Sequence, residues 1–300
     1  MGLHYLEDGQ WVESEEVVEP TPFGAVAPRL AYRASFAANL NTAGAIELAP
    51  PDGGKPLRSH FLCLRLTDTS SGRNQIIARI KDAVGEIVPP NHVWYRDAFE
   101  GLMADVRCIA ARDAFEADVV LRESPELPAG FDPKSTRLEI ISEFLDPPEP
   151  LVRPMPVDPV SGWVDEELDF GGMLMIQGRV LVAGTEKEAV QVSDPRPVIL
   201  KHWQTLGDRR FLIESIEFPA LRPLIGSLPA KKVGSNLLAG SQVLPPAPLL
   251  KPGTGPLRLA SSRGPLTGVV IDYVNGGNSL GAPPYQRPAV SRSRSAPRTP

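Results

Sequence analysis

Gly277, Ser279 and Gly281 form a G-x-S-x-G motif, the pattern in this chain that most resembles an active site. In hydrolases that use this motif the serine is the nucleophile, a helix follows it, and the catalytic histidine comes later in the chain. Here two prolines follow at 283–284, and the last histidine is His202. We therefore expect Ser279 to lie in a turn or a loose tail and not to act as a nucleophile.

A second candidate is the acidic run of Asp165, Glu166, Glu167 and Asp169 beside Trp163. Carboxylate oxygens could hold Ca²⁺, but the D-x-[DN]-x-[DN]-G spacing of a calcium loop is missing. Two of these carboxylates could instead serve as the acid and base of a glycoside hydrolase. The third interpretation, which we prefer, is a solvated loop.

The histidines and cysteines suggest no metal site. His4, His60, His92 and His202 are isolated from one another, and no Cys/His spacing fits zinc. Nucleotide-binding glycine motifs and kinase signatures are missing as well. The sequence thus predicts no catalytic residues, no metal and no cofactor.

The two cysteines, Cys63 and Cys108, both lie in apolar runs that are typical of strands. We expect two small buried hydrophobic side chains, which is how free cysteine usually behaves. A disulfide between neighbouring strands is the alternative if the chain is exported.

The tryptophans could provide a binding surface. Trp11, Trp94, Trp163 and Trp203 could stack on sugar rings, although aromatic side chains of β-proteins are usually part of the core. We keep Trp94 and Trp163 as candidate ligand contacts.

Composition excludes two classes of partner. Acidic residues outnumber basic ones, 36 to 31, whereas a dedicated nucleic-acid binder needs a basic face for phosphate. No apolar run approaches the roughly 18 residues of a membrane-spanning helix.

Residues 1–8 lack the basic start and the apolar stretch of a signal peptide.

Period-two alternation, the signature of β-strands, recurs along the chain. In 57–66 it places His60, Leu62, Leu64 and Leu66 on one face and Phe61, Cys63 and Arg65 on the other. In 137–144 it places Leu138, Ile140 and Phe144 on one face and Arg137, Glu139 and Glu143 on the other. Asp8-Gly9 and Gly207-Asp208 mark hairpin turns.

A single short helix is predicted at 219–228, where Pro219 starts a run with apolar residues at helical spacing. We therefore predict an all-β fold, a predominantly antiparallel β-sandwich that divides further into two packed sub-domains.

The predicted organisation has four parts. Residues 1–146 form a β-sandwich module, 147–159 a proline-rich connector or edge, 160–232 a second β sub-domain that ends in the helix, and 233–300 a linker and tail. A lone strand-like run lies at 268–274. From Tyr273 onward the chain has no acidic residue and carries Arg287, Arg292, Arg294 and Arg298, so we expect a disordered basic tail.

Residues 93–108 (VWYRDAFEGLMADVRC) and 115–121 (FEADVVL) resemble a known signature, Y-x-D-A-x-x-G-x-x-A-D-V-x-Y followed by F-x-x-D-V-V-L. It belongs to a β-rich module near the start of very large bacterial secreted or surface proteins, of the RHS/YD-repeat and right-handed β-helix types. Residues 136–148 and 210–218 are similar to later strands of that module, and Cys108 replaces its common aromatic residue. The resemblance extends over about residues 3–274.

The resemblance implies an extracellular or cell-surface location and carries over no catalytic residue. We expect a non-enzymatic structural or adhesion-type module, with other domains of a larger polypeptide or a cell-surface glycan or protein as partner. The alternative is a carbohydrate-binding module or a glycoside-active β-sandwich. We also expect the chain to be one module of a larger gene, truncated or shifted in frame after about Val274.

Overall fold

The computed structural model describes residues 4–51, 53–158, 163–182, 197–231, 244–251, 255–260, 268–272 and 274–275. Strands dominate these ranges, and neighbouring strands are antiparallel apart from one short parallel pair, β9 with β21. The predicted all-β, antiparallel fold is confirmed. No helix in the described ranges is long and apolar enough to cross a membrane.

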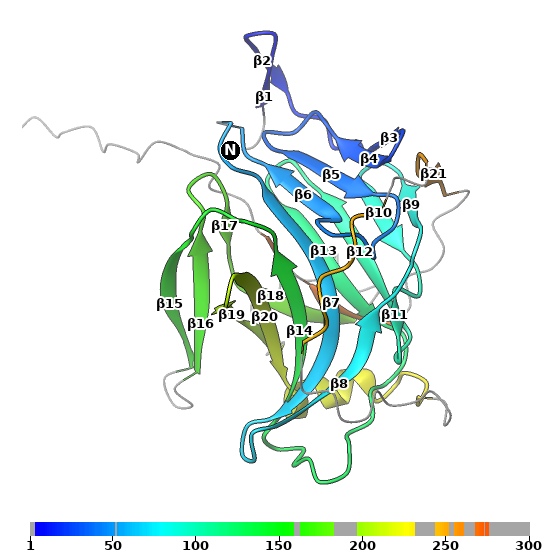
Figure 1. The fold of residues 1–300 in the computed structure, drawn as a ribbon, viewed down its shortest axis with the longest axis vertical. Helices are drawn as coiled ribbons and strands as arrows, with labels where there is room; N and C mark the ends of the chain where they lie inside the picture. The colour runs from blue at the N-terminus through cyan, green and yellow to red at the C-terminus, as the bar shows by residue number, and fades with distance from the viewer. Residues whose placement is uncertain are drawn as a thin grey trace, which may run out of the picture.

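The largest unit is a barrel in which the strand ladder closes on itself (Figure 1). Its first side is built from β3 (Glu19–Thr21), β4 (Gly24–Ala27), β5 (Arg33–Ala37), β6 (Ile46–Ala49), β7 (Leu57–Asp68), β8 (Arg73–Ile80), β11 (Phe99–Glu100), β14 (Thr136–Phe144), β19 (Val198–Leu206) and β20 (Arg209–Glu217). Its second side is built from β9 (Gly85–Val88), β10 (His92–Tyr95), β12 (Ala104–Ala110), β13 (Phe115–Leu121), β18 (Gly178–Val182), β21 (Arg258–Leu259), β22 (Val269–Asp272) and β23 (Val274–Asn275).

The two sides join at shared strands. β19 pairs with β18 through Val198 and Ile199, and with β20 from Leu200 onward. On the opposite flank β8 pairs with β11, which leads into β12. The sheets expected of a sandwich therefore form one continuous ladder around a common core.

Two smaller sheets stand outside the barrel. β1 (His4–Glu7) and β2 (Gln10–Glu13) form a hairpin that projects from the top of the molecule in Figure 1. Its turn residues Asp8 and Gly9 both have positive φ, 49° and 80°, which confirms the predicted turn. The other small sheet contains β15 (Leu151–Asp158), β16 (Trp163–Asp169) and β17 (Leu174–Met175).

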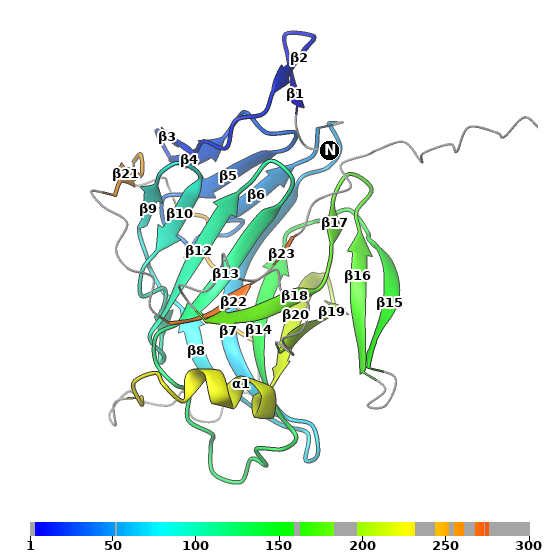
Figure 2. The ribbon, with the colours of Figure 1, turned by 180° about the vertical axis from the view of Figure 1, so that it is seen from behind.

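The helix α1 (Phe218–Ile225) lies across the lower end of the barrel in Figure 2, against β14 and β20. Pro219 occupies its first turn, and Phe218, Leu221 and Ile225 are buried. It ends at Ile225, three residues before the predicted end at 228, and Gly226 caps it. The prediction of one short helix at this place is confirmed.

The predicted segments share strand ladders. β14 of the first segment pairs with β7 on one edge and with β20 of the third segment on the other. The strand-like run near 268–274 forms β22, which lies between β13 and β18. Residues 160–232 and 233–300 thus both contribute strands to the barrel. The predicted disordered tail from 276 onward lies outside the described residues.

The proline-rich connector is largely a strand. Residues 151–158 form β15, which pairs with β16 and is the outer strand of its sheet. Pro154 and Pro156 lie within it, as expected for an edge strand, since proline has no N–H to donate to a ladder.

The alternation predicted for 57–66 is wrong at its centre. In the β7–β14 ladder Cys63 pairs with Ile141 and Phe61 with Ser142, so Leu62 is an extra residue, a β-bulge. The bulge reverses the phase: Leu64 and Leu66 face the barrel core together with Phe61, whereas Leu62 and Cys63 pack in a separate outer cluster.

The alternation predicted for 137–144 is correct for the apolar residues, since Leu138, Ile140 and Phe144 are all in the core. The opposite face is not open to solvent, because Glu139 and Glu143 are also buried there. Both carboxylates are held in ion pairs, Glu139 with Arg65 and Glu143 with Arg209.

Gly101 offers a test of the close approach between β8 and the turn before β12. It has φ of +101°, and a Cβ atom there would lie 2.5 Å from the carbonyl oxygen of Ile77. We expect Gly101→Ala to lower the free energy of unfolding by about 2–3 kcal/mol, since backbone strain and a backbone collision add. Urea denaturation would measure the loss.

Gly72→Ala is the matched control. Gly72 has φ of +69° but nothing within 4 Å of the added Cβ. It should cost about 1 kcal/mol, the strain of a left-handed backbone alone. Equal losses in the two variants would contradict the proposed collision with Ile77.

Candidate functional site

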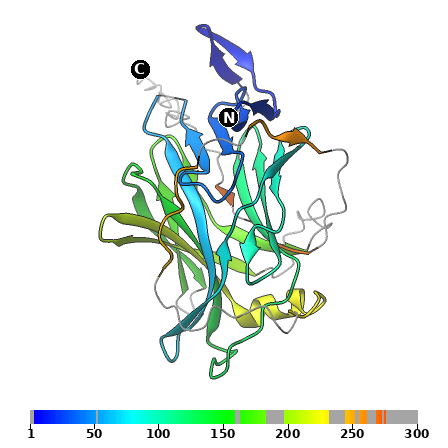
Figure 3. The same ribbon diagram turned by 45° about the vertical axis from the view of Figure 1, so that its right-hand side comes forward.

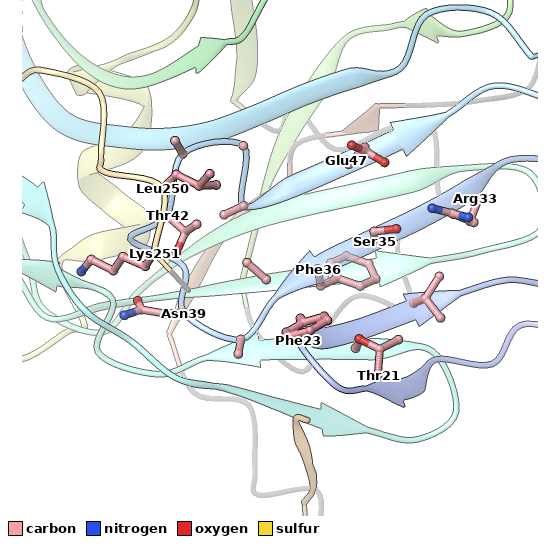
Figure 4. Close-up of a pocket in the computed structure, with 17 residues that line it drawn as sticks. Thr21, Phe23, Arg33, Ser35, Phe36, Asn39, Thr42, Glu47, Leu250 and Lys251 are labelled. Carbon is pink, nitrogen blue, oxygen red and sulfur yellow. The ribbon is translucent and has the colours of Figure 1, made fainter. Parts of the chain in front are cut away.

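The candidate site is an open groove of about 650 Å³ on the outer face of β4, β5 and β6 (Figure 4). Small residues explain the hollow, since Ala37, Ala43, Gly44 and Ala45 line it without filling it. Phe23, in the turn between β3 and β4, borders the groove with 71% of its surface exposed. An exposed aromatic ring at a groove lined by small side chains is suited to binding.

Polar side chains lie toward both ends of the groove. In Figure 4, Arg33 and Glu47 lie toward one end, and Thr42 and Lys251 toward the other, with Phe23 between them. The register explains the first group, because Ser35 on β5 is directly opposite Glu47 on β6. Arg33 comes two residues before Ser35 and therefore lies on the same face of the sheet.

One wall of the groove is a strap, residues 244–251, that runs over the outside of the barrel (Figure 3). Leu244 packs against the outer cluster that contains Leu62 and Cys63. The Ala43 N–H donates to the Leu249 carbonyl at 3.3 Å, and Lys251 forms an ion pair with Asp82. The strap is thus fixed at several points while the Leu250 side chain stays exposed.

The predicted ligand contacts lie elsewhere. Trp94 is 5% exposed and packs with Val88, Val120 and Val270. The Arg96 guanidinium lies 3.9 Å from the centre of its ring, a cation–π contact. A sugar could stack on Trp94 only if the Arg96 guanidinium and the packed valines moved away from its ring. Trp163 begins β16, but its side chain lies outside the described residues, so ligand contact there stays a prediction.

The acidic run is not the solvated loop that we expected. It forms β16, in which Glu167 and Asp169 form ion pairs with Arg153, while Asp165 and Glu166 bind the outer edge of β19 beyond the two residues that pair with β18. The Lys201 N–H donates to Asp165 Oδ1 at 2.6 Å and the Trp203 N–H to Glu166 Oε2 at 2.6 Å. The side chains of Asp165 and Glu166 therefore substitute for a neighbouring strand.

A buried network surrounds Glu143 on the outer face of β14. Arg209 donates through Nε and Nη2 to its two carboxylate oxygens, each at 2.7 Å. His60 Nε2 lies 3.2 Å from Oε2, and the Gly44 N–H donates to His60 Nδ1, which assigns the ring proton to Nε2. Burial raises the pKa of Glu143, but the hydrogen bonds from Arg209 and His60 outweigh burial and lower it to about 2.

The pKa of Glu214 is shifted in the opposite direction to that of Glu143. It faces the barrel interior, paired across the ladder with Lys201, whose ammonium binds Asp165 at 2.8 Å. One Glu214 oxygen has no hydrogen-bond partner. Burial raises the pKa of Glu214 well above its ordinary range, and Lys201 offsets this only in part. This carboxyl therefore keeps its proton to a higher pH than an exposed glutamate does.

Both cysteines are free and buried, as predicted. Cys108 lies in the barrel core and Cys63 in the outer cluster. Burial raises the pKa of Cys63 to about 12 and raises that of Cys108 as well, so neither thiol is a nucleophile at neutral pH.

Among the described residues, no group of three or more His, Cys, Asp or Glu side chains could hold a metal ion. The G-x-S-x-G motif at 277–281 lies outside these residues. Sequence reasoning missed the groove, and the one local signal was the run of small residues at 42–45 after the polar turn at 39–41.

Comparisons of the chain with protein-family models, with curated proteins and with solved structures find no match. The resemblance to the bacterial surface module thus stays a prediction, and the geometry of the groove carries the functional argument.

Glu143 gives a pH-dependent prediction. Because its folded pKa is depressed, its carboxylate stabilises the fold fully above its ordinary pKa of 4.5 and loses this effect as the pH falls toward about 2. Glu143→Gln should cost about 2 kcal/mol at pH 7, and its difference from the wild type should shrink over that window. Urea titrations at several pH values would measure this; the control Glu149→Gln, whose side chain is 72% exposed, should change little.

For Glu214 we predict the reverse dependence of folding stability on pH. Its raised pKa means that the folded state retains a proton that the unfolded state releases above about pH 4.5. Stability from this group therefore falls as the pH rises, and Glu214→Gln, which cannot ionise, should gain stability relative to the wild type over the same rise. Parallel pH curves for the two proteins would show that Glu214 is not held protonated.

Proposed function

We propose that this chain is a non-enzymatic, adhesion-type module of a larger exported protein, and that it binds its ligand in the groove on β4–β6. The observation that supports this proposal best is the combination of an exposed Phe23, an open hollow and polar side chains of both charges on one face of the sheet. Concave surfaces with an apolar centre and a few polar groups are the usual form of ligand sites.

The chemistry of the groove supports binding rather than turnover. Its lining contains one carboxylate, Glu47, and neither histidine nor cysteine. Glycoside hydrolysis ordinarily needs two carboxylates on opposite sides of the scissile bond, and general acid–base work needs a titratable pair. The carboxylates of the acidic run, which could have formed such a pair, are already engaged: Asp165 and Glu166 bind the edge of β19, and Glu167 and Asp169 form ion pairs with Arg153.

The strands around the groove form a continuous sheet that holds its side chains in place. β5, at the centre of the groove, pairs with β4 on one edge and β6 on the other, and β6 in turn pairs with the long strand β7. Side chains placed on such strands keep their spacing better than side chains on loops. The exported location and the larger polypeptide follow from the resemblance alone.

A bead assay tests the proposal. Beads coated with the full chain would be allowed to settle on a neutral polysaccharide, an anionic polysaccharide and gelatin. We expect retention on at least one surface, a loss of about tenfold with Phe23→Ala, and a ligand that mass spectrometry finds unchanged.

Trp11→Ala is the matched control, because Trp11 is an aromatic residue with the same 71% exposure on the β1–β2 hairpin, outside the groove. Equal retention of wild type and Phe23→Ala beads on every surface would refute the groove as the binding site. Cleavage of the bound ligand would refute a non-enzymatic role.

A further inference from the structure

We infer that the ligand of this groove is an uncharged oligosaccharide chain. This inference depends on the proposed function and adds the chemical class of the ligand. It comes from the shape of the groove, from the aromatic ring at its centre, from the absence of free backbone groups in its floor strand and from its balance of charge.

The shape fits a chain of several units. A volume of about 650 Å³ is within the usual range for ligand sites, yet the groove is open along the sheet and does not enclose its contents. Polar groups at both ends, with Phe23 between, can bind successive units of one ligand (Figure 4). A compact metabolite would leave one end of the groove unused.

Phe23 provides a flat apolar face. The C–H groups of a sugar ring are weakly positive, and the face of an aromatic ring is negative, so the two attract beyond simple burial of area. The small side chains of Ala37 and Ala45, which line the same groove as Phe23, leave space in it for a sugar ring. Stacking of this kind needs no charge on the ligand.

The floor recognises ligands through side chains and not through backbone. β5 uses both of its edges, pairing with β4 and with β6 along its length. An extended peptide that bound on the floor as an added strand would need free N–H and C=O groups at a sheet edge, which β5 does not offer; the nearest edge is that of β3, which contributes only Thr21 to the lining. Hydroxyl-rich ligands suit the groove better, because Ser35, Arg33 and Glu47 present donors and acceptors on one face.

The charges balance within the groove. Arg33 and Glu47 are the charged residues at one end, with opposite signs, on neighbouring strands on either side of Ser35. At the other end Lys251 is neutralised by Asp82. With one charge of each sign among the lining residues of this end, the groove has little preference for an anionic polymer, and a guanidinium and a carboxylate on neighbouring strands can each hold hydroxyl groups of a neutral sugar.

The test is a binding titration of the full chain with polysaccharides. Neutral glucan, mannan and galactan oligosaccharides would be compared with alginate and heparin by calorimetry, in salt of about 0.05 M and about 0.5 M. We expect at least one neutral oligosaccharide to bind with an affinity that changes less than about twofold between these salt concentrations, since no ion pair forms.

Variants locate the binding. Phe23→Ala should weaken it about tenfold through lost stacking. Glu47→Ala should weaken it more than Glu47→Gln, because glutamine keeps an oxygen acceptor. Trp11→Ala should bind like the wild type. Circular dichroism would show that these exposed substitutions leave the fold unchanged.

The outcomes separate this inference from the proposed function. Groove-dependent binding of alginate or heparin, lost in high salt, would overturn the uncharged ligand but support the adhesion role. Groove-dependent retention on gelatin, with no oligosaccharide bound, would do the same. If Phe23→Ala alters no binding at all in either assay, both proposals fail.

Discussion

Backbone hydrogen bonding at strand edges is the constraint on which this structure depends. A strand with an unpaired edge leaves N–H and C=O groups without partners, and here the ladder closes around the core so that few edges remain. β19 is the critical joint, because it belongs to both sides of the barrel. Where β18 stops, the carboxylates of Asp165 and Glu166 take the next two outward N–H groups. Two residues of the acidic run thus complete the edge of a barrel strand from a neighbouring sheet.

The need of buried polar groups for partners also explains where the charged residues lie. Glu143 is buried on the outer face of the barrel because Arg209 and His60 satisfy it, and Lys201 is buried inside because Asp165 does. Glu214 is tolerated beside them because it keeps its proton. In contrast to these paired groups, the groove combines accessible polar side chains with the exposed ring of Phe23, and the proposed function rests on that combination.

Much of the fold could be predicted from local patterns, and the failures have physical reasons. Alternation identified β14 and its core residues, and the Asp8-Gly9 and Gly207-Asp208 turns marked hairpins, because these signals depend on neighbours in sequence. The bulge at Leu62 could not be predicted, since an extra residue depends on the partner strand. The acidic run looked solvated because its partners, at 201–203, are far away in sequence. The groove arises from missing side-chain volume, which leaves almost no pattern to find.

The prolines of β15 limit how a strand of another chain can pair with this edge of the sheet. As the outer strand of its sheet, β15 would otherwise be a template onto which a strand of another chain could add. At positions 154 and 156 it has no amide hydrogen, so a growing sheet would lack donors at two successive sites along that flank. The exposed Leu151 and Met155 can still pack against a neighbour, but addition of strand after strand along this edge into a continuous sheet is disfavoured.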